Sequence, residues 1–296
     1  MGNRNNGGAG RSSRSLTRSL MYVAFSRAVS ASGLYLIGDF REPSPPDRNS
    51  SLQREYARQQ QCQLLPVFRF LREPRQCQQL LFHNVQSLRA HLQLVTSDKV
   101  YMHSDLLLFA ETWLCEDQSC EIPGFTMVAS ASRGSHGSSA VGACCYVSER
   151  LQSLVHGVMA GIQRFGRQSV SVAAATIRGT RFISMYASPG TRVEQITSTI
   201  APYFSETSMH YVLACDINID LRKNGEQQRQ IQALLNNYNL RMTTPSDSYS
   251  TRAGTRIDYI FTTLSNTEAG AYTTVSKSFH YPLWLRFNFC DEVLLS

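Results

Sequence analysis

The stretch Val212-Leu-Ala-Cys-Asp-Ile-Asn-Ile-Asp220 begins as an apolar run and ends in acidic and amide residues. Side chains of an extended strand alternate between two faces, so Asp216 and Asn218 are predicted to project from the same face. A carboxylate and a carboxamide placed in this way can grip one phosphate or one attacking water. Asp and Asn are also common where a buried strand passes into a turn, because both residue types cap turns. The stretch alone therefore leaves a catalytic and a purely structural role open.

The length and composition of the chain indicate a globular protein. Its 296 residues, 42% of them hydrophobic, are enough for one large domain or two small ones. No run of about 18 apolar residues occurs, so no transmembrane helix and no membrane partner are expected. The start of the chain lacks the apolar segment of a secretory signal. Its eight cysteines form no Cys-x-x-Cys pair, which predicts neither a zinc site nor a disulfide framework. We expect an intracellular protein.

The positive charge lies at the N-terminal end. Residues 1–78 contain 12 Lys and Arg against 5 Asp and Glu, whereas the two kinds are equal, at 17 each, from residue 79 onward. The net charge of +7 therefore belongs entirely to the first quarter of the chain. Such a segment either binds nucleic acid through nonspecific phosphate contacts or is a solvated leader. Within it, residues 1–19 are Gly, Asn, Ser and Arg with little apolar content, so we predict a disordered basic tail.

Residues 20–40 contain an apolar segment, a Ser/Gly break and a short strand-like run. Their Tyr22-Val-Ala-Phe-Ser-Arg27, followed by Gly33-Leu-Tyr35, resembles the last motif of Pif-like DNA helicases. The resemblance implies that Arg27 derives from a residue that contacts nucleotide phosphates. The chain has no Gly-x-x-x-x-Gly-Lys-Ser/Thr loop to hold a triphosphate, so no ATP binding is expected. We interpret residues 20–40 as the remnant of an upstream helicase, or as the trace of a truncated gene model.

Residues 41–78 have the composition of a linker, because three prolines are followed by Gln, Arg and Ser. A short helix is predicted over residues 51–61. Residues 64–79 alternate apolar and basic side chains and are either the end of the linker or a strand leading into the next domain.

A regular pattern of short apolar runs begins at Leu80. The predicted strands are Leu80–Asn84, Asp105–Glu111, Phe125–Ser130, Gly142–Val147, Val170–Ile177, Arg181–Tyr186, Tyr211–Cys215, Ile257–Thr262 and Trp284–Phe289. Helices are predicted over Gln86–Lys99, Arg192–Phe204 and Glu226–Leu240. Many strands with few helices favour an α/β protein made of packed sheets flanked by helices over a doubly wound parallel sheet.

Five polar clusters lie in a fixed order at the ends of these strands. They are Asn84 in His83-Asn-Val-Gln-Ser-Leu88, Glu111 in Glu111-Thr-Trp-Leu114, Tyr186 in Tyr186-Ala-Ser-Pro-Gly190, Asp216 with Asn218, and Asp258 in Ile257-Asp-Tyr-Ile-Phe261 with His280 in Phe279-His-Tyr-Pro-Leu283. Together, over residues 79–291, they resemble the endonuclease/exonuclease/phosphatase superfamily, and more narrowly the apurinic-type endonucleases of mobile elements. A helicase remnant ahead of such a domain is similar to the arrangement in rolling-circle transposons.

This resemblance implies a four-layer α/β sandwich of two packed, mainly antiparallel β-sheets flanked by helices. It also implies a hydrolase that cleaves the DNA backbone with Mg²⁺, or with Mn²⁺ as a substitute, and that acts in the nucleus. Glu111 would bind the metal, because a hard cation prefers carboxylate oxygen, and Asn84 would hold the metal shell or a phosphate oxygen. Taken alone, Glu111 is equally compatible with a surface acid that begins a turn.

The resemblance implies that the other residues take part in hydrolysis of the phosphodiester bond. Asp216 would act as general base on the attacking water, and Asn218 would orient that water. His280 would stabilise the charge that grows on the phosphate, held by Asp258, whose carboxylate favours the charged imidazole. Tyr186 would donate a hydrogen bond to the phosphate or the leaving oxygen, although a core tyrosine bonded to backbone remains the alternative.

One position departs from the superfamily pattern. An Asp usually precedes the histidine as a further metal-site or phosphate-site carboxylate, and Phe279 stands there in this chain. This leaves three functions open: DNA cleavage, hydrolysis of a small phosphoester such as an inositol phosphate or phospholipid, and a catalytically impaired nucleic-acid-binding domain. Arg252 and Arg256 either contact a nucleic-acid backbone or are ordinary exposed loop residues.

Overall fold

The computed structural model describes residues 50, 51, 53, 54, 77–116, 118–133, 140–204, 206, 208–223, 225–243, 248–272 and 278–289. The chain divides into two compact units, residues 1–64 and 65–296, and the elements below belong to the second. The predicted basic tail, the helicase-like segment and nearly all of the linker lie outside the described residues and stay predictions. Ser51, Gln53 and Arg54 are helical, in agreement with the first turn of the helix predicted over residues 51–61.

Two six-stranded sheets form the body of the second unit. The first contains, in spatial order, β11 (Glu268–Ala271), β12 (Leu283–Phe287), β1 (Gln78–Asn84), β2 (Leu106–Ala110), β4 (Ala143–Ser148) and β3 (Phe125–Ala131). The second contains β5 (Val155–Phe165), β6 (Gln168–Ile177), β7 (Thr180–Ala187), β8 (His210–Asp216), β10 (Asp258–Thr262) and β9 (Arg241–Met242). Strands β1 and β2 pair in parallel, as do β7 and β8, and the other neighbours pair antiparallel.

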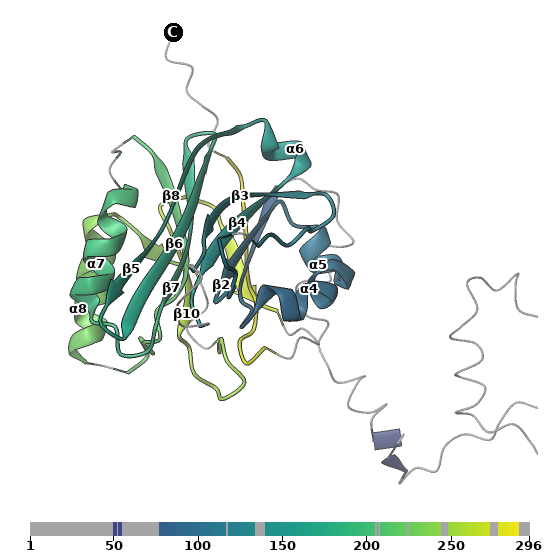
Figure 1. The fold of residues 1–296 in the computed structure, drawn as a ribbon. Helices are drawn as coiled ribbons and strands as arrows, with labels where there is room; N and C mark the ends of the chain where they lie inside the picture. The colour runs from purple at the N-terminus through teal and green to yellow at the C-terminus, as the bar shows by residue number, and fades with distance from the viewer. Residues whose placement is uncertain are drawn as a thin grey trace, which may run out of the picture. The chain divides into compact units, whose positions relative to one another are not determined.

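Helices cover the outer faces of both sheets (Figure 1). The helices α4 (Leu88–Ser97) and α5 (Lys99–Met102) lie against the first sheet, and α7 (Val193–Ile200) and α8 (Glu226–Asn237) lie against the second. A short helix, α6 (Glu149–Gln152), follows β4. The four layers confirm the predicted α/β sandwich of two mainly antiparallel sheets. Within the described part of the chain, no helix is long and apolar enough to cross a membrane.

Strands in the middle of both sheets are buried on both faces, which is why they read as continuous apolar runs. In β1, Leu80 and Phe82 pack between the two sheets, whereas Leu81 packs toward α4. Phe182 of β7 faces the same inter-sheet core, and its neighbour Ile183 faces α7 and α8. Successive side chains therefore pack alternately between the two sheets and against the helices, because neighbouring residues of a strand point to opposite faces.

Three strands were not predicted: β5, β9 and β11. β5 is an edge strand whose side chains are half-buried or exposed, so it carries no continuous apolar run. β9 and β11 have only two and four residues, too short for a recognisable pattern.

Two predicted helices are each divided. Asp98 ends α4 and accepts a hydrogen bond from the backbone N–H of Val100, so it also begins α5. The helix predicted over residues 192–204 is α-helical only to Ile200 and continues as a 3₁₀ turn, Ala201–Phe204. Pro202 lies in that turn and has no N–H to continue the α-helical hydrogen bonds.

The strand register brings the predicted polar residues to one end of the sandwich. Asn84 pairs with Ala110, the residue before Glu111, across the parallel strands β1 and β2. In the second sheet, Asp216 lies opposite both Tyr186 on β7 and Asp258 on β10. Strand ends from both sheets therefore meet at one site.

Candidate active site

Asn84 connects the two sheets at this site. Its side-chain amide donates one hydrogen bond to Glu111 Oε1 at 2.8 Å and another to Asp216 Oδ2 at 2.7 Å. Its Oδ1 accepts the backbone N–H of Gln86 at 3.2 Å. The amide is buried, as are both carboxylates. Asn84 thus holds two acids close together, and its predicted role as a direct metal ligand stays a prediction.

Asp216 uses its two oxygens differently. Oδ1 accepts the backbone N–H of Asn218 at 2.9 Å, which closes the turn after β8, while Oδ2 faces Asn84. Asn218 lies beyond the end of β8, with φ of 53°, so it is not part of the extended strand assumed from the sequence. Its carboxamide donates to the carbonyl oxygen of Ala187 at 2.9 Å. One oxygen of Asp216 therefore caps the turn, and the other is part of the polar cluster. The backbone N–H of Asn218 holds the Asp216 carboxylate in position.

His280 and Asp258 form a buried pair. The imidazole Nδ1 lies 2.8 Å from Asp258 Oδ2 and 3.9 Å from Asp216 Oδ2. The carboxylate can only accept, so Nδ1 carries the proton and Nε2 is the ring nitrogen directed elsewhere. Asp258 is itself held by the hydroxyl of Ser250, which accepts its backbone N–H at 3.0 Å.

The charges of the site shift its acid–base equilibria in two ways. Burial and the charge of Asp258 raise the pKa of Asp216 well above its ordinary value, although His280, Asn84 and Asn218 favour its charged form. A carboxylate with a raised pKa is a stronger base. Burial lowers the pKa of His280, but the charge and hydrogen bond of Asp258, with Asp216 and Glu111, outweigh it and raise that pKa to about 9.

Glu111 is held in an unusual backbone conformation. Its φ is 48°, a left-handed value that side-chain-bearing residues seldom adopt, and Trp113 two residues later has φ of 56°. The Trp113 indole N–H donates to Glu111 Oε2 at 3.3 Å. Tyr186 hydrogen-bonds Glu111 as well; burial, the charges of Glu111 and Asp216 and this bond raise the pKa of Tyr186, which keeps its hydroxyl protonated. Strained backbone of this kind is frequent at functional sites.

His83 supports the site from behind, a role that the sequence did not reveal. It precedes Asn84 on β1, so it points to the opposite face of the sheet. Its Nε2 lies 3.2 Å from the carbonyl oxygen of His280, and its Nδ1 lies 2.7 Å from the hydroxyl of Tyr101. Burial, with the charge of His280, lowers the pKa of His83 to about 3 despite the opposing backbone hydrogen bond, so the ring is neutral at neutral pH.

We expect His83→Phe to destabilise the protein. The phenyl ring fills much of the space but leaves the His280 carbonyl and the Tyr101 hydroxyl buried without partners, at about 1–3 kcal/mol for each group. The free energy of unfolding, measured with urea, checks this. His156→Phe is the matched control, because His156 is exposed on β5 and its replacement should change stability by less than about 0.5 kcal/mol. Equal stability of both variants would contradict the buried hydrogen-bond chain.

The donor set fits a divalent cation. Among the described residues, Glu111, Asp216 and His280 form a group whose ligand atoms all lie within 4.8 Å of one another. Three buried carboxylates, counting Asp258, meet one imidazole here, and Asp258 Oδ1 has no hydrogen-bond partner within the described part of the chain. Such an excess of buried negative charge favours a bound cation, and carboxylate oxygens suit Mg²⁺ or Mn²⁺.

Three residues near the cluster take no direct part in it. Phe279 is exposed on the surface beside His280. Asp220 is engaged by Arg222, at 2.9 and 2.6 Å, and takes no part in the cluster. Arg256, considered as an exposed loop residue, is 5% exposed, and its guanidinium lies 5.6 Å from the centre of the Tyr259 ring.

Comparisons with known proteins identify the fold. No family model matches the sequence, and no curated protein sequence is similar enough to match it. Among solved structures, the endonuclease domain of TRAS1, a telomere-specific non-LTR retrotransposon, matches with a TM-score of 0.52 and 14% identity over 72% of this chain and 99% of its own. AP endonuclease LMAP from Leishmania major matches with a TM-score of 0.58 and 12% identity over 73% of this chain and 89% of its own.

A third structure carries the family description itself. It is an endonuclease/exonuclease/phosphatase family protein from Leptotrichia buccalis, with a TM-score of 0.52 and 12% identity over 72% of this chain and 100% of its own. These identities are low, so the likeness concerns the fold. Residues 77–289 of this chain have the α/β-sandwich fold of the endonuclease/exonuclease/phosphatase proteins.

Proposed function

We propose that this protein is a metal-dependent phosphodiesterase that cleaves the DNA backbone. The observation that carries the proposal is the buried cluster in which Asn84 joins Glu111 to Asp216, with His280 3.9 Å from the same Asp216 oxygen. Hydrolysis of a phosphodiester needs a base for water and positive charge on the phosphate oxygens. The cluster supplies the base through Asp216 and positive charge through His280.

Asp216 takes the proton from the attacking water in this proposal. Its raised pKa makes it a stronger base than an exposed carboxylate, and its position is held by Asn84 from one side and Asn218 from the other. Asn218 was expected to orient the water directly. Its carboxamide is engaged by Ala187, so we assign it the positioning of Asp216 instead.

His280 stabilises the negative charge that develops on the phosphate. Asp258 holds its Nδ1, which leaves Nε2–H to donate to a phosphate oxygen. The raised pKa keeps the ring cationic at neutral pH. Tyr186 keeps its hydroxyl proton and lies on β7 next to Asp216; the bond that it makes to Glu111 would be exchanged for one to the phosphate or the leaving oxygen.

Glu111 would hold the metal, and Asn84 orients the Glu111 and Asp216 carboxylates beside it. When bound, Mg²⁺ or Mn²⁺ supplies Lewis-acid stabilisation of the phosphate charge. The protein's own contribution is a pre-assembled set of oxygens, which lowers the cost of stripping water from the ion.

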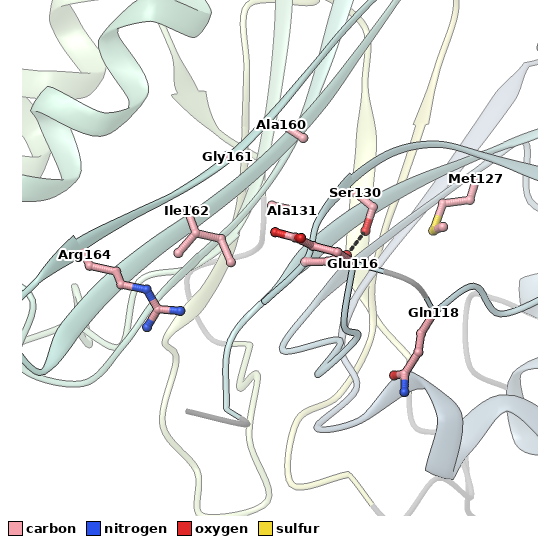
Figure 2. Close-up of a pocket in the computed structure, with 10 residues that line it drawn as sticks. Glu116, Gln118, Met127, Ser130, Ala131, Ala160, Gly161, Ile162 and Arg164 are labelled. Carbon is pink, nitrogen blue, oxygen red and sulfur yellow. Dashed lines mark hydrogen bonds between the residues drawn. The ribbon is translucent and has the colours of Figure 1, made fainter. Parts of the chain in front are cut away.

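A groove at the edge of the sandwich favours a polymeric substrate. It is open, has a volume of about 460 Å³ and lies between the edge strands β3 and β5 (Figure 2). The register places Ala131 of β3 opposite Ala143, whose other partner Ala110 precedes Glu111, so the groove lies at the same end of the sandwich as the site. Its lining includes Gln118 and Arg164, which can donate to phosphate oxygens beyond the scissile one.

We also propose that the protein derives from a mobile element. Two of the similar structures are a retrotransposon endonuclease domain and an AP endonuclease. Together with the helicase-like motif of residues 20–40, they support descent from a mobile element and action on DNA in the nucleus. We propose no part for ATP.

Supercoiled plasmid tests the function directly. We expect the protein to convert it to the nicked form with Mg²⁺ or Mn²⁺, and EDTA to stop the reaction because the carboxylates then face one another without a cation. Gel electrophoresis of the products measures this. Hydrolysis of inositol phosphates without plasmid nicking would favour a small-phosphoester phosphatase, and metal-independent plasmid binding without cleavage would favour an impaired nucleic-acid-binding domain.

A further inference from the structure

Phe279 is one of three large apolar side chains that the described residues expose strongly. Val158, Tyr249 and Phe279 are 54%, 53% and 39% exposed. Val158 lies on the edge strand β5, whereas Phe279 adjoins His280 and Tyr249 precedes Ser250, whose hydroxyl accepts the backbone N–H of Asp258. These rings do not contribute to the core, and exposed apolar side chains often mark a binding surface.

The backbone around Phe279 is held firmly although its ring is exposed. Its N–H donates to Gln86 Oε1 at 3.0 Å, and its carbonyl oxygen accepts the backbone N–H of Arg252 at 3.0 Å. The ring stands edge-on to the imidazole of His280, with centroids 5.6 Å apart and an interplanar angle of 82°. Phe279 is therefore pre-positioned at the rim of the site, immediately beside the group assigned to the phosphate.

Tyr249 is carried by the segment that pairs with Phe279 and His280. Thr251 forms an antiparallel bridge with His280, and the backbone N–H of Tyr281 donates to the carbonyl oxygen of Ser250 at 2.7 Å. The guanidinium of Arg222 lies 5.2 Å from the centre of the Tyr249 ring. A second exposed ring, with the cation of Arg222 over it, is thus carried by the backbone segment that pairs with His280.

We propose that Phe279 and Tyr249 stack on nucleobases that flank the scissile phosphate, so that this rim recognises an unpaired DNA strand. The inference rests on the proposed function in taking DNA as the ligand. Every base has a flat face, and only bases released from a duplex stack can lie against a protein ring. Arginines among the rings add attraction for the phosphates between those bases.

Phe279 replaces the carboxylate that the superfamily pattern has before the histidine. Its ring is exposed, whereas an aromatic residue of the core would be buried. The position then contributes contact with the nucleotide, and metal binding relies on Glu111. Phe279 is a specificity-determining residue on this reading.

Binding of two fluorescently labelled DNA single strands of equal length tests the proposal, one with bases and one made of abasic sites. The full-length protein is titrated in EDTA, so that no strand is cut. Wild type should bind the strand with bases more tightly, by roughly 5- to 150-fold for each stacked base. Phe279→Leu should lose about one such factor for the strand with bases and none for the abasic strand.

Conservative variants separate stacking from general damage. Phe279→Trp and Tyr249→Phe should keep the preference for bases, and the fluorescence of the new Trp should fall when the strand with bases binds. Val158→Ala, which removes an equally exposed apolar side chain from β5, should change neither affinity.

Equal affinity of wild type for both strands would overturn the proposal, as would an equal loss for both strands in Phe279→Leu. The plasmid assay is run on the same preparations to judge the proposed function by itself. Metal-dependent nicking without a base preference would refute only the stacking rim. A base preference that depends on Phe279, without nicking, would refute only the catalytic function.

Discussion

Asp216→Asn is expected to lower the rate of DNA nicking by about 10²–10⁴-fold, while the protein remains folded. The amide cannot accept the proton of the attacking water. Its size matches the carboxylate, and its oxygen can still accept the backbone N–H of Asn218, which Ala at this position would leave buried and unpaired. Initial rates of plasmid nicking at saturating Mg²⁺ measure the effect.

The stability of this variant reflects two opposing effects. The new amide presents a donor to the donor of Asn84, which loses a hydrogen bond of about 0.5–1.5 kcal/mol. Removal of a buried charge beside Asp258 relieves the repulsion that raises the pKa of Asp216. We therefore expect the free energy of unfolding to change by less than about 1.5 kcal/mol.

Asp220→Asn is the matched control for Asp216→Asn. Asp220 follows the same strand but is engaged by Arg222, and that hydrogen bond lowers its pKa to about 2. This variant should nick plasmid at the wild-type rate. Full activity of Asp216→Asn, or loss of activity in both variants, would refute the assignment of Asp216 as the base.

His280→Gln is expected to lower the turnover number by about 10²–10³-fold, the usual effect of removing one group that stabilises developing charge. Gln can donate one hydrogen bond but carries no charge. A rate within about threefold of wild type would give His280 a structural role only. His91→Gln is the control, because His91 lies on α4 and its Nδ1 meets the carbonyl oxygen of Ser87 within the same helix end.

The pH dependence gives the second measurement on His280. Its folded-state pKa of about 9 lies above the ordinary value of 6.5, so the imidazole of the metal-free protein stays charged until the pH rises through 9. Its contribution to folding stability is then complete below pH 6.5 and is lost as the pH rises through 9. NMR titration of the ring measures the pKa, and Asp258→Asn should move it downward because the nearest negative charge is removed.

The sequence predicted packed sheets from its many short apolar runs and few helices, and the resemblance to the superfamily implied the four-layer sandwich. Leu80–Asn84 and Val212–Asp216 have no polar residue on either face until the strand approaches the site, apart from His83. Their apolar runs end in polar residues, and the order of five such clusters along the chain, which resembles that of the superfamily, pointed to Asn84, Glu111, Asp216 and the other candidate site residues. β5 escaped prediction because an edge strand with half-exposed side chains has no such run.

The tertiary structure decided which partners these residues contact, because those partners lie far away along the chain. The amide of Asn84 bridges acids 27 and 132 positions away, and His83 meets the backbone of His280 across 197 positions. Neither contact leaves a local periodic signal. The exposure of Phe279 also depends on the fold, since an aromatic residue between Ser278 and His280 reads in sequence as a core residue or a lost ligand. Only the packing of the two sheets, which buries His280 and leaves Phe279 at the rim, assigns them different roles.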